Sequence, residues 1–275
     1  MNPVTIGGIQ GIVYSGQQLP EPPHILIVGG EKSGKSTLAT TLMNWPQPGN
    51  MPLVLAFDKT GPDSCAQIGY QIPHIKIKDR PGATFAEKCQ TTITEIGLAF
   101  GRRSPDFPFT SIVCDCASTL TEKLLDEEKQ LHPDYKDPRK HYGAVLDHSK
   151  AIMWRLLDLQ VPVIWLSWDK EPFVAETVNE KTQQKSKRQV MGKPFTAGNF
   201  GKILAGKVHQ IMILEKLKIG VGVEGADPQG YVRQLHTRTW ENYEAGGRFS
   251  SLLPEPAPAN LGYVLNCVSG IRNGG

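Results

Sequence analysis

The chain has 275 residues, of which 39% are hydrophobic, and this is enough apolar material to bury the core of one large domain or two small ones. Its 30 Lys and Arg residues nearly balance its 27 Asp and Glu residues, and the net charge of +3 excludes a chain that attracts polyanions through its overall charge. The five cysteines form no CxxC pair, and no apolar stretch approaches the roughly 20 residues of a membrane span. We therefore expect a globular cytoplasmic protein with reduced thiols, no secretion signal and no membrane contact.

Short apolar runs alternate with longer amphipathic stretches after an irregular N-terminal arm, which we expect over residues 1–23. The predicted strands of this part cover residues 24–28, 52–57, 75–77, 111–114 and 163–166. The predicted helices cover residues 35–44, 85–100 and 142–160. This order favours an α/β fold with right-handed crossovers and a mostly parallel central sheet.

The C-terminal part is less regular. A polar stretch over residues 176–193 precedes a predicted short helix at 201–205 and a predicted strand at 209–214. Residues 216–223 and 231–236 predict a C-terminal β-hairpin, because a Gly-containing turn separates them. From Pro254 onward the chain is rich in proline and then weakly apolar, which is typical of a tail.

Residues 29–36 match the phosphate-loop motif G-x-x-x-x-G-K-[ST] in full and lie between a predicted strand and a predicted helix. Glycines let the backbone wrap a phosphate, and the helix N-terminus adds partial positive charge. Lys35 is expected to reach the β- and γ-phosphates of ATP, and Ser36 to bind Mg²⁺. The expected nucleotide-binding residues are Gly29, Gly30, Glu31, Lys32, Ser33, Gly34, Lys35, Ser36 and Thr37.

A phosphate loop needs a carboxylate for the metal, usually at the end of an apolar strand. Asp115 follows such a run and is the expected second metal residue, although an aspartate there could also cap the helix that follows. Hydrolysis needs a group that orients or deprotonates water. Asp58, at the end of the second predicted strand, and Asp63 are the candidates.

The phosphate loop, the runs at residues 55–58 and 112–115, and the strand at 163–167 with its polar continuation resemble the ATPase core of RecA-type recombinases. More narrowly, the chain is similar to the core-only RecA-like nucleotide-binding proteins of phages, some of which act in strand annealing or recombination. The resemblance covers roughly residues 24–250 and leaves residues 251–275 as a C-terminal tail. It implies a RecA-like core that uses ATP and Mg²⁺. It also implies single-stranded DNA and a single-strand DNA-binding protein as partners, in a bacterial host cytoplasm if the protein is phage-encoded.

This chain departs from the family at one catalytic position and offers several candidates at another. The family's water-polarising glutamate, two residues beyond the aspartate of the second strand, corresponds to Thr60. Either Asp58 or Asp63 substitutes for it, or hydrolysis is slow and ATP acts mainly as a conformational ligand. The family's polar sensor corresponds by position to Ser167, Asp169 or Lys170. We favour Lys170, because a cation there could sense the γ-phosphate.

RecA-like ATPases complete their sites with a cation from the neighbouring subunit. Arg248 lies where the related phage proteins often carry a basic residue, although the lysine often found just before it is glycine here. Arg233 and Arg238 on the predicted hairpin are rivals. Such a head-to-tail interface generates a ring or an open filament.

The family carries a mobile DNA-binding loop after the sensor strand. The cations at this place are Lys181, Lys185, Lys187, Arg188 and Lys193. Each phosphate that they neutralise should add about 0.7 to the salt slope on single strands. Phe173 and Phe195 bracket the loop and would either stack on bases or anchor the loop in the core.

Three functions fit these features. The preferred one is a DNA-dependent ATPase of RecA type, slow until DNA stimulates it, that assembles on single-stranded DNA for recombination, annealing or replication. An ATP-gated DNA-binding or assembly protein with little hydrolysis is the second, because Thr60 replaces the expected glutamate. A P-loop kinase of a small molecule or nucleotide, with the basic loop as its lid, is the third.

Overall fold

The computed structural model describes residues 2–6, 9–13, 22–44, 51–57, 65–66, 72–77, 80–102, 107–170, 173–178, 185–190, 192–224, 226–227, 229–240 and 243–269. One large sheet contains the parallel strands β3 (His24–Gly29), β4 (Met51–Ala56), β5 (His74–Lys76), β6 (Phe109–Asp115), β7 (Val163–Lys170) and β11 (Gln210–Lys218). The antiparallel strands are β10 (Lys193–Pro194), β12 (Tyr231–His236), β13 (Gly246–Gly247) and β14 (Ala257–Pro258). The strand order is β14-β12-β11-β3-β7-β6-β4-β5, with β10 beside β7 and β13 beside β11.

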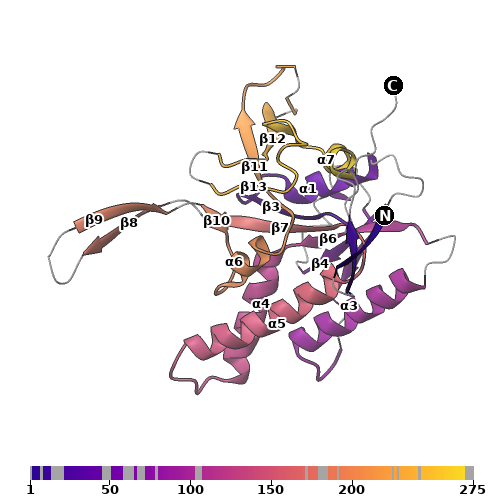
Figure 1. Cartoon of the computed structure of the whole chain (residues 1–275). Helices are drawn as coiled ribbons and strands as arrows, with labels where there is room; N and C mark the ends of the chain where they lie inside the picture. Colours follow the sequence, from indigo (N-terminus) through magenta and orange to yellow (C-terminus); the bar gives the residue numbers. More distant parts are fainter. Residues whose placement is uncertain are drawn as a thin grey trace.

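Helices cover both faces of this sheet (Figure 1). One face carries α3 (Phe85–Gly101), α4 (Ala117–Leu131), α5 (Arg139–Leu157) and α6 (Phe200–Ala205). The other carries α1 (Lys35–Thr40), the 3-10 turn η1 (Thr41–Asn44) and α7 (Leu261–Ser269). Alternate residues of β3 enter the two cores: Leu26 and Val28 pack with the first helix group, and Ile25 and Ile27 with the second. A strand buried on both faces reads as a continuous apolar run, which explains why the sequence predicts it well.

The predicted fold class is confirmed. The strands and helices expected between residues 24 and 170 are present, each within a few residues of its predicted bounds. The mostly parallel sheet places β7 between β3, which precedes the phosphate loop, and β6, which carries Asp115. The predicted C-terminal hairpin is also present, because β11 and β12 pair antiparallel from Ile213 with His236 to Lys218 with Tyr231.

Four segments differ from the expectation. The N-terminal arm contains a hairpin of β1 (Asn2–Ile6) and β2 (Ile9–Val13), whose sequence signal is the Gly-Gly pair between two β-rich runs. The strand expected at 209–214 and the first hairpin strand are one strand, β11. The polar stretch after β7 forms a ribbon of β8 (Phe173–Val178) and β9 (Lys185–Val190).

The fourth difference concerns the expected tail. Helix α7 buries Leu261, Val264, Leu265 and Val268, a stripe with helical spacing, against the second core. The apolar core therefore continues beyond residue 250. Among the described residues, no helix is long and apolar enough to cross a membrane.

Candidate nucleotide-binding site

The phosphate loop leaves the carboxyl end of β3 and enters α1. Gly34, directly before the helix, has a φ of +97°, a left-handed conformation that favours glycine. At Gly29 a Cβ would lie 3.0 Å from both the Leu214 carbonyl and the Ser33 hydroxyl. The Ser33 hydroxyl is itself buried without a hydrogen-bond partner among the described residues. The loop thus combines a glycine-dependent backbone with an unsatisfied buried hydroxyl, which suits a phosphate ligand.

The Lys35 ammonium folds back onto this loop. Its Nζ donates hydrogen bonds of 2.7 Å to the carbonyls of Gly29 and Gly30. The side chain is buried, and burial lowers the pKa of Lys35, while nearby anions such as Asp115 and Asp169 act in the opposite direction. A charge held in this way by neutral carbonyls can exchange them for phosphate oxygens.

Ser36 and Asp115 meet at the edge of the loop. The Ser36 hydroxyl donates to Asp115 Oδ2 at 2.7 Å, although the two residues are 79 positions apart. A hydroxyl and a carboxylate in contact suit Mg²⁺, which prefers oxygen ligands and usually takes one or two carboxylates together with substrate phosphates. Within the described ranges, no group of three or more His, Cys, Asp or Glu side chains could hold a metal by itself. A metal ion here would therefore rely on Ser36, Asp115 and the phosphates of the nucleotide.

The end of β7 brings a second carboxylate to the loop. Asp169 Oδ1 lies 3.7 Å from the position of a Cβ on Gly30, and Asp169 Oδ2 accepts a hydrogen bond of 3.0 Å from the Tyr243 hydroxyl. Lys170 is exposed, and its backbone pairs with Lys193 of β10. Of these two sensor candidates, Asp169 lies against the phosphate loop, and a sensor role for Lys170 stays a prediction.

Arg233 contacts the phosphate loop of its own chain. Its Nε donates to the Ser33 carbonyl at 3.0 Å, and its Nη1 pairs with Asp227 Oδ2 at 2.8 Å. A Cβ on Gly34 would lie 2.6 Å from this Nε. In the sequence Arg233 is a candidate only as a cation for a neighbouring subunit, and no local pattern predicts this contact, because it joins residues 200 positions apart.

Arg248 lies at the other end of the sheet. Its amide donates to the His209 carbonyl. The preceding residue, Gly247, pairs with Gln210 of β11, and Gln210 in turn pairs with Ile25 of β3. Gly29 lies four positions beyond Ile25 along the strand, a distance of roughly 13 Å. Arg248 therefore does not complete the site of its own chain, and its action on a neighbouring subunit stays a prediction.

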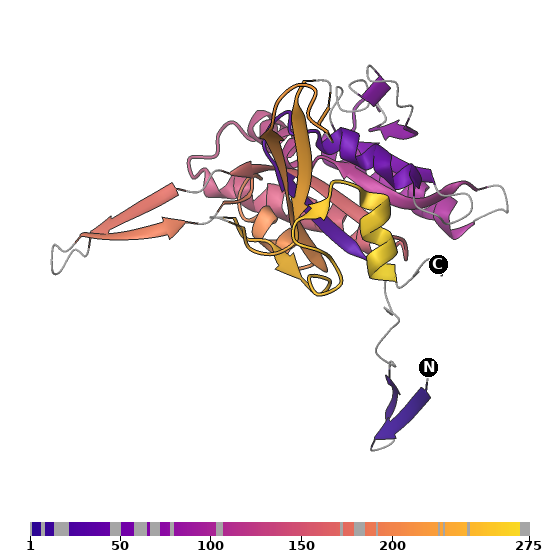
Figure 2. The ribbon, with the colours of Figure 1, turned by 90° about the horizontal axis from the view of Figure 1, so that it is seen from above.

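The remaining expected site residues fall in two groups. Asp58, Thr60, Asp63 and Lys181 lie outside the described residues. Lys185, Lys187 and Arg188 are on β9, which projects from the sheet away from β3 and α1 (Figures 1 and 2).

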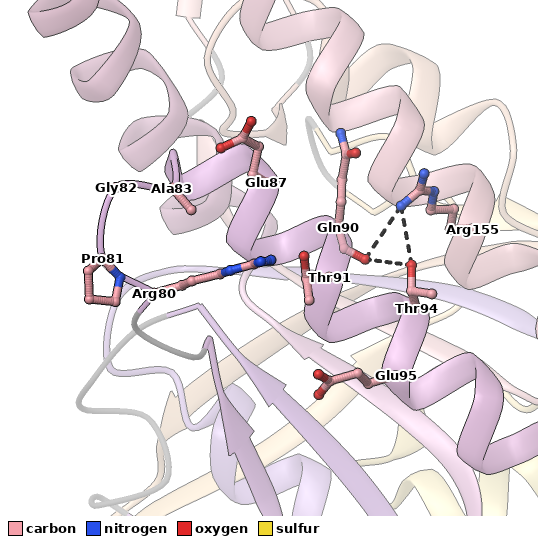
Figure 3. A pocket seen from close by; sticks show the side chains of 10 residues that line it. All are labelled: Arg80, Pro81, Gly82, Ala83, Glu87, Gln90, Thr91, Thr94, Glu95 and Arg155. Atoms are coloured by element: carbon pink, nitrogen blue, oxygen red, sulfur yellow. Dashed lines mark hydrogen bonds between the residues drawn. The ribbon is translucent and has the colours of Figure 1, made fainter.

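A separate groove of about 600 Å³ lies along α3 and the end of α5 (Figure 3). Arg155 of α5 lies beside α3 at one end of the groove, where its Nη1 donates to the Gln90 carbonyl and the Thr94 hydroxyl at 3.4 Å (Figure 3). Two arginines and two glutamates line the groove, together with residues 81–83 and polar positions of α3. None of its lining residues belongs to the phosphate loop, so it does not place an acceptor beside a bound γ-phosphate.

A family model described as an AAA domain matches residues 21–249. The chain belongs to this AAA-domain family. Among solved structures, it is similar to a KaiC-like protein from the hyperthermophilic archaeon Pyrococcus horikoshii, with 11% identity over 83% of this chain and 84% of that chain and a TM-score of 0.41. No curated protein matches the chain. The matched region ends before β14 and α7, which complete the second core.

Proposed function

We propose that this AAA-domain protein is a DNA-dependent ATPase of RecA type that binds single-stranded DNA and assembles head to tail for recombination, annealing or replication. The observation that carries the proposal is the path from the phosphate loop to a basic ribbon. Strand β7 contacts the loop through Asp169 and ends at Lys170, and β8 begins three residues later at Phe173. A change in the contacts of the γ-phosphate could therefore shift the end of β7, and with it the start of the ribbon formed by β8 and β9.

The ribbon has the charge that a nucleic acid requires. It extends away from the sheet and its helices (Figures 1 and 2). Lys185, Lys187 and Arg188 are three of the six residues of β9, and Glu176, the only acidic residue of the two strands, stands opposite Lys187 in the register. Cations concentrated on a projecting ribbon can neutralise several phosphates, although the chain as a whole is nearly neutral.

An aromatic side chain lies at the root of this ribbon. Phe195 is 39% exposed, and its ring stacks on Trp168 with 6.3 Å between the centroids. Its amide donates to the Trp168 carbonyl, which ties it to the end of β7. Lys193, two residues earlier, is exposed. An exposed ring beside cations is the combination on which bases of single strands stack.

The nucleotide would be held by the residues of the phosphate loop. Lys35 would exchange the carbonyls of Gly29 and Gly30 for phosphate oxygens, and the amides at the start of α1 would orient the same phosphates. Mg²⁺, when bound at Ser36 and Asp115, would offset the negative charge of the phosphates. A kinase is less well supported, because the groove along α3 is separate from this loop.

The proposal is tested by measuring the ATPase rate with and without single-stranded DNA, beside electron micrographs of the same mixtures. We expect stimulation by DNA together with rings or filaments. Fast hydrolysis that is independent of DNA would favour another class of enzyme. ATP binding with DNA-dependent assembly but without hydrolysis would favour the ATP-gated assembly protein.

A triple variant tests the ribbon itself. Replacing Lys185, Lys187 and Arg188 with alanine should weaken single-strand binding and reduce the salt slope by about 2, since each lost phosphate contact removes about 0.7. The matched control changes the net charge equally at exposed positions near the connection of α4 to α5, namely Lys129, Lys136 and Lys140. Equal salt slopes for the two triple variants would contradict a DNA-binding ribbon.

A further inference from the structure

Three described carboxylates act on the Lys35 ammonium, and they are not equivalent. Asp115 accepts the hydrogen bond of Ser36, so its place is with the metal. Glu31 is exposed on the loop. Asp169 is half-buried at the end of β7 and approaches the loop at Gly30. Of these three carboxylates, only Asp169 is partly buried and neither bonded to Ser36 nor expected to bind the metal.

The two oxygens of Asp169 have different surroundings. Oδ2 accepts the Tyr243 hydroxyl at 3.0 Å, whereas Oδ1 is the atom that lies against Gly30. Tyr243 is in turn fixed by close packing, because a Cβ on Gly192 would lie 2.3 Å from its ring. The hydrogen bond from Tyr243 therefore orients the Asp169 carboxylate so that Oδ1 faces the phosphate loop.

We propose that Asp169 is the catalytic base of ATP hydrolysis, with Tyr243 as its positioning residue; this rests on the proposed ATPase function. Asp169 would replace the water-polarising glutamate of RecA-like proteins, whose position is occupied by Thr60 in this chain. A water molecule held by Oδ1 attacks the γ-phosphorus of ATP, and its proton passes to Oδ1 as the new P–O bond forms. The bond between the γ-phosphorus and the bridging oxygen breaks, and ADP leaves with the electron pair. The carboxyl group then returns its proton to the solvent, which leaves ADP and phosphate as the products.

Asp169→Asn separates a catalytic role of Asp169 from a purely structural one, for which the variant should keep the wild-type hydrolysis rate. Asn at this position keeps an oxygen that can accept the Tyr243 hydroxyl, so Asp169→Asn preserves the anchor and removes only the charge and the base. The charge also matters for binding, because a carboxylate beside the phosphate loop repels a nucleotide. Loss of the base should therefore lower kcat while ATP binds as tightly as before or more tightly.

The experiment compares single-turnover hydrolysis and ATP affinity for the wild type, Asp169→Asn, Asp169→Glu and Tyr243→Phe. We expect Asp169→Asn to lower the hydrolysis rate by about 100-fold or more without weakening ATP binding. We expect Asp169→Glu to restore part of the rate, and Tyr243→Phe to lower it less than Asp169→Asn does. Asp147→Asn, at an exposed position of α5, is the matched control and should leave the rate unchanged.

The outcomes separate this inference from the proposed function. Wild-type hydrolysis rates in a folded Asp169→Asn variant would overturn the catalytic base and leave the ATPase intact. The same holds if Asp58→Asn abolishes hydrolysis while Asp169→Asn retains it. A wild-type chain that binds ATP without hydrolysing it, or that does not bind ATP, would overturn both proposals.

Discussion

At the carboxyl ends of β3, β6 and β7, buried polar side chains surround a backbone that can accept a ligand. Lys35 is satisfied there by two loop carbonyls, Ser36 by Asp115, and the Ser33 hydroxyl has no partner among the described residues. At the amino ends of the neighbouring strands β3 and β11, polar side chains are just as buried, but His209 and Gln210 bind backbone groups of the sheet and its connections, and His24 Nδ1 has no partner among the described residues. The His24 amide donates to His209 Nδ1 at 3.0 Å, and the two rings stack with 5.1 Å between their centroids.

The difference between the two ends of the strands shows which buried polar groups indicate a ligand site. Lys35 has partners that a phosphate can replace without disturbing the sheet. Gln210, at the amino end, bridges the Thr237 carbonyl and the Phe249 amide, and a replacement of either bond would open the sheet edge. The carboxyl ends of parallel strands are also where α/β folds bind ligands. Changes at the two ends should therefore separate binding from stability.

Lys35→Met gives the largest expected effect. It removes an ammonium that would make charge-assisted bonds to phosphate, so ATP affinity should fall by about 100-fold or more. The melting temperature should not fall, because burial lowers the pKa of Lys35 and the charged form is therefore costly to bury. Nucleotide titration and thermal unfolding of the same samples measure both effects. Undiminished ATP affinity would overturn the nucleotide site, and Lys129→Met, at an exposed position of α4, is the control.

His24 gives the next effect, at the opposite end and on stability alone. Burial, and then the charge of His209, lower the pKa of His24 from 6.5 to about 4. The folded state thus favours the neutral ring, so the contribution of His24 is fully present above pH 6.5 and is lost as the pH falls toward 4. The loss amounts to roughly 3 kcal/mol.

Urea unfolding between pH 7 and pH 4 measures this contribution. His24→Leu should show a smaller loss of stability over that interval than the wild type, whereas His74→Leu, at an exposed position of β5, should follow the wild type. Parallel pH curves for the wild type and His24→Leu would contradict the assignment.

The sequence predicts the elements whose signal is local. Strand β3 is a continuous apolar run, and the phosphate loop is a contiguous motif between a strand and a helix. Helix α7 is missed because its nine residues follow a proline-rich segment, and β9 because five of its six residues are polar, while its partner β8 ends inside the same polar stretch. The pairing of β8 with β9 depends on the register between two strands rather than on an apolar pattern.

The same limit applies to the site. Lys35, Ser36 and Asp115 carry recognisable motifs, and the structure brings all three together. Asp169 is only one of three sensor candidates in the sequence. What distinguishes it is the hydrogen bond from Tyr243, which is 74 positions away. Contacts of this kind depend on how separate strand ends meet, and no spacing within one segment encodes them.

Gln210→Ala gives the smallest expected effect and is the most direct test of the comparison. Gln210 is fully buried at the amino end, where its Nε2 donates to the Thr237 carbonyl at 2.8 Å and its Oε1 accepts from the Phe249 amide at 3.2 Å. Alanine leaves the Phe249 amide buried without this bond and the Thr237 carbonyl with the Ser250 hydroxyl as its donor, which should cost about 2 kcal/mol of unfolding free energy. Gln130→Ala, at an exposed position of α4, is the control. ATP affinity should stay unchanged in both variants, because Gln210 lies at the far end of the strands from the phosphate loop. A loss of affinity that parallels the loss of stability would instead mean that the amino end helps to hold the loop, and the two ends would then form one cooperative unit.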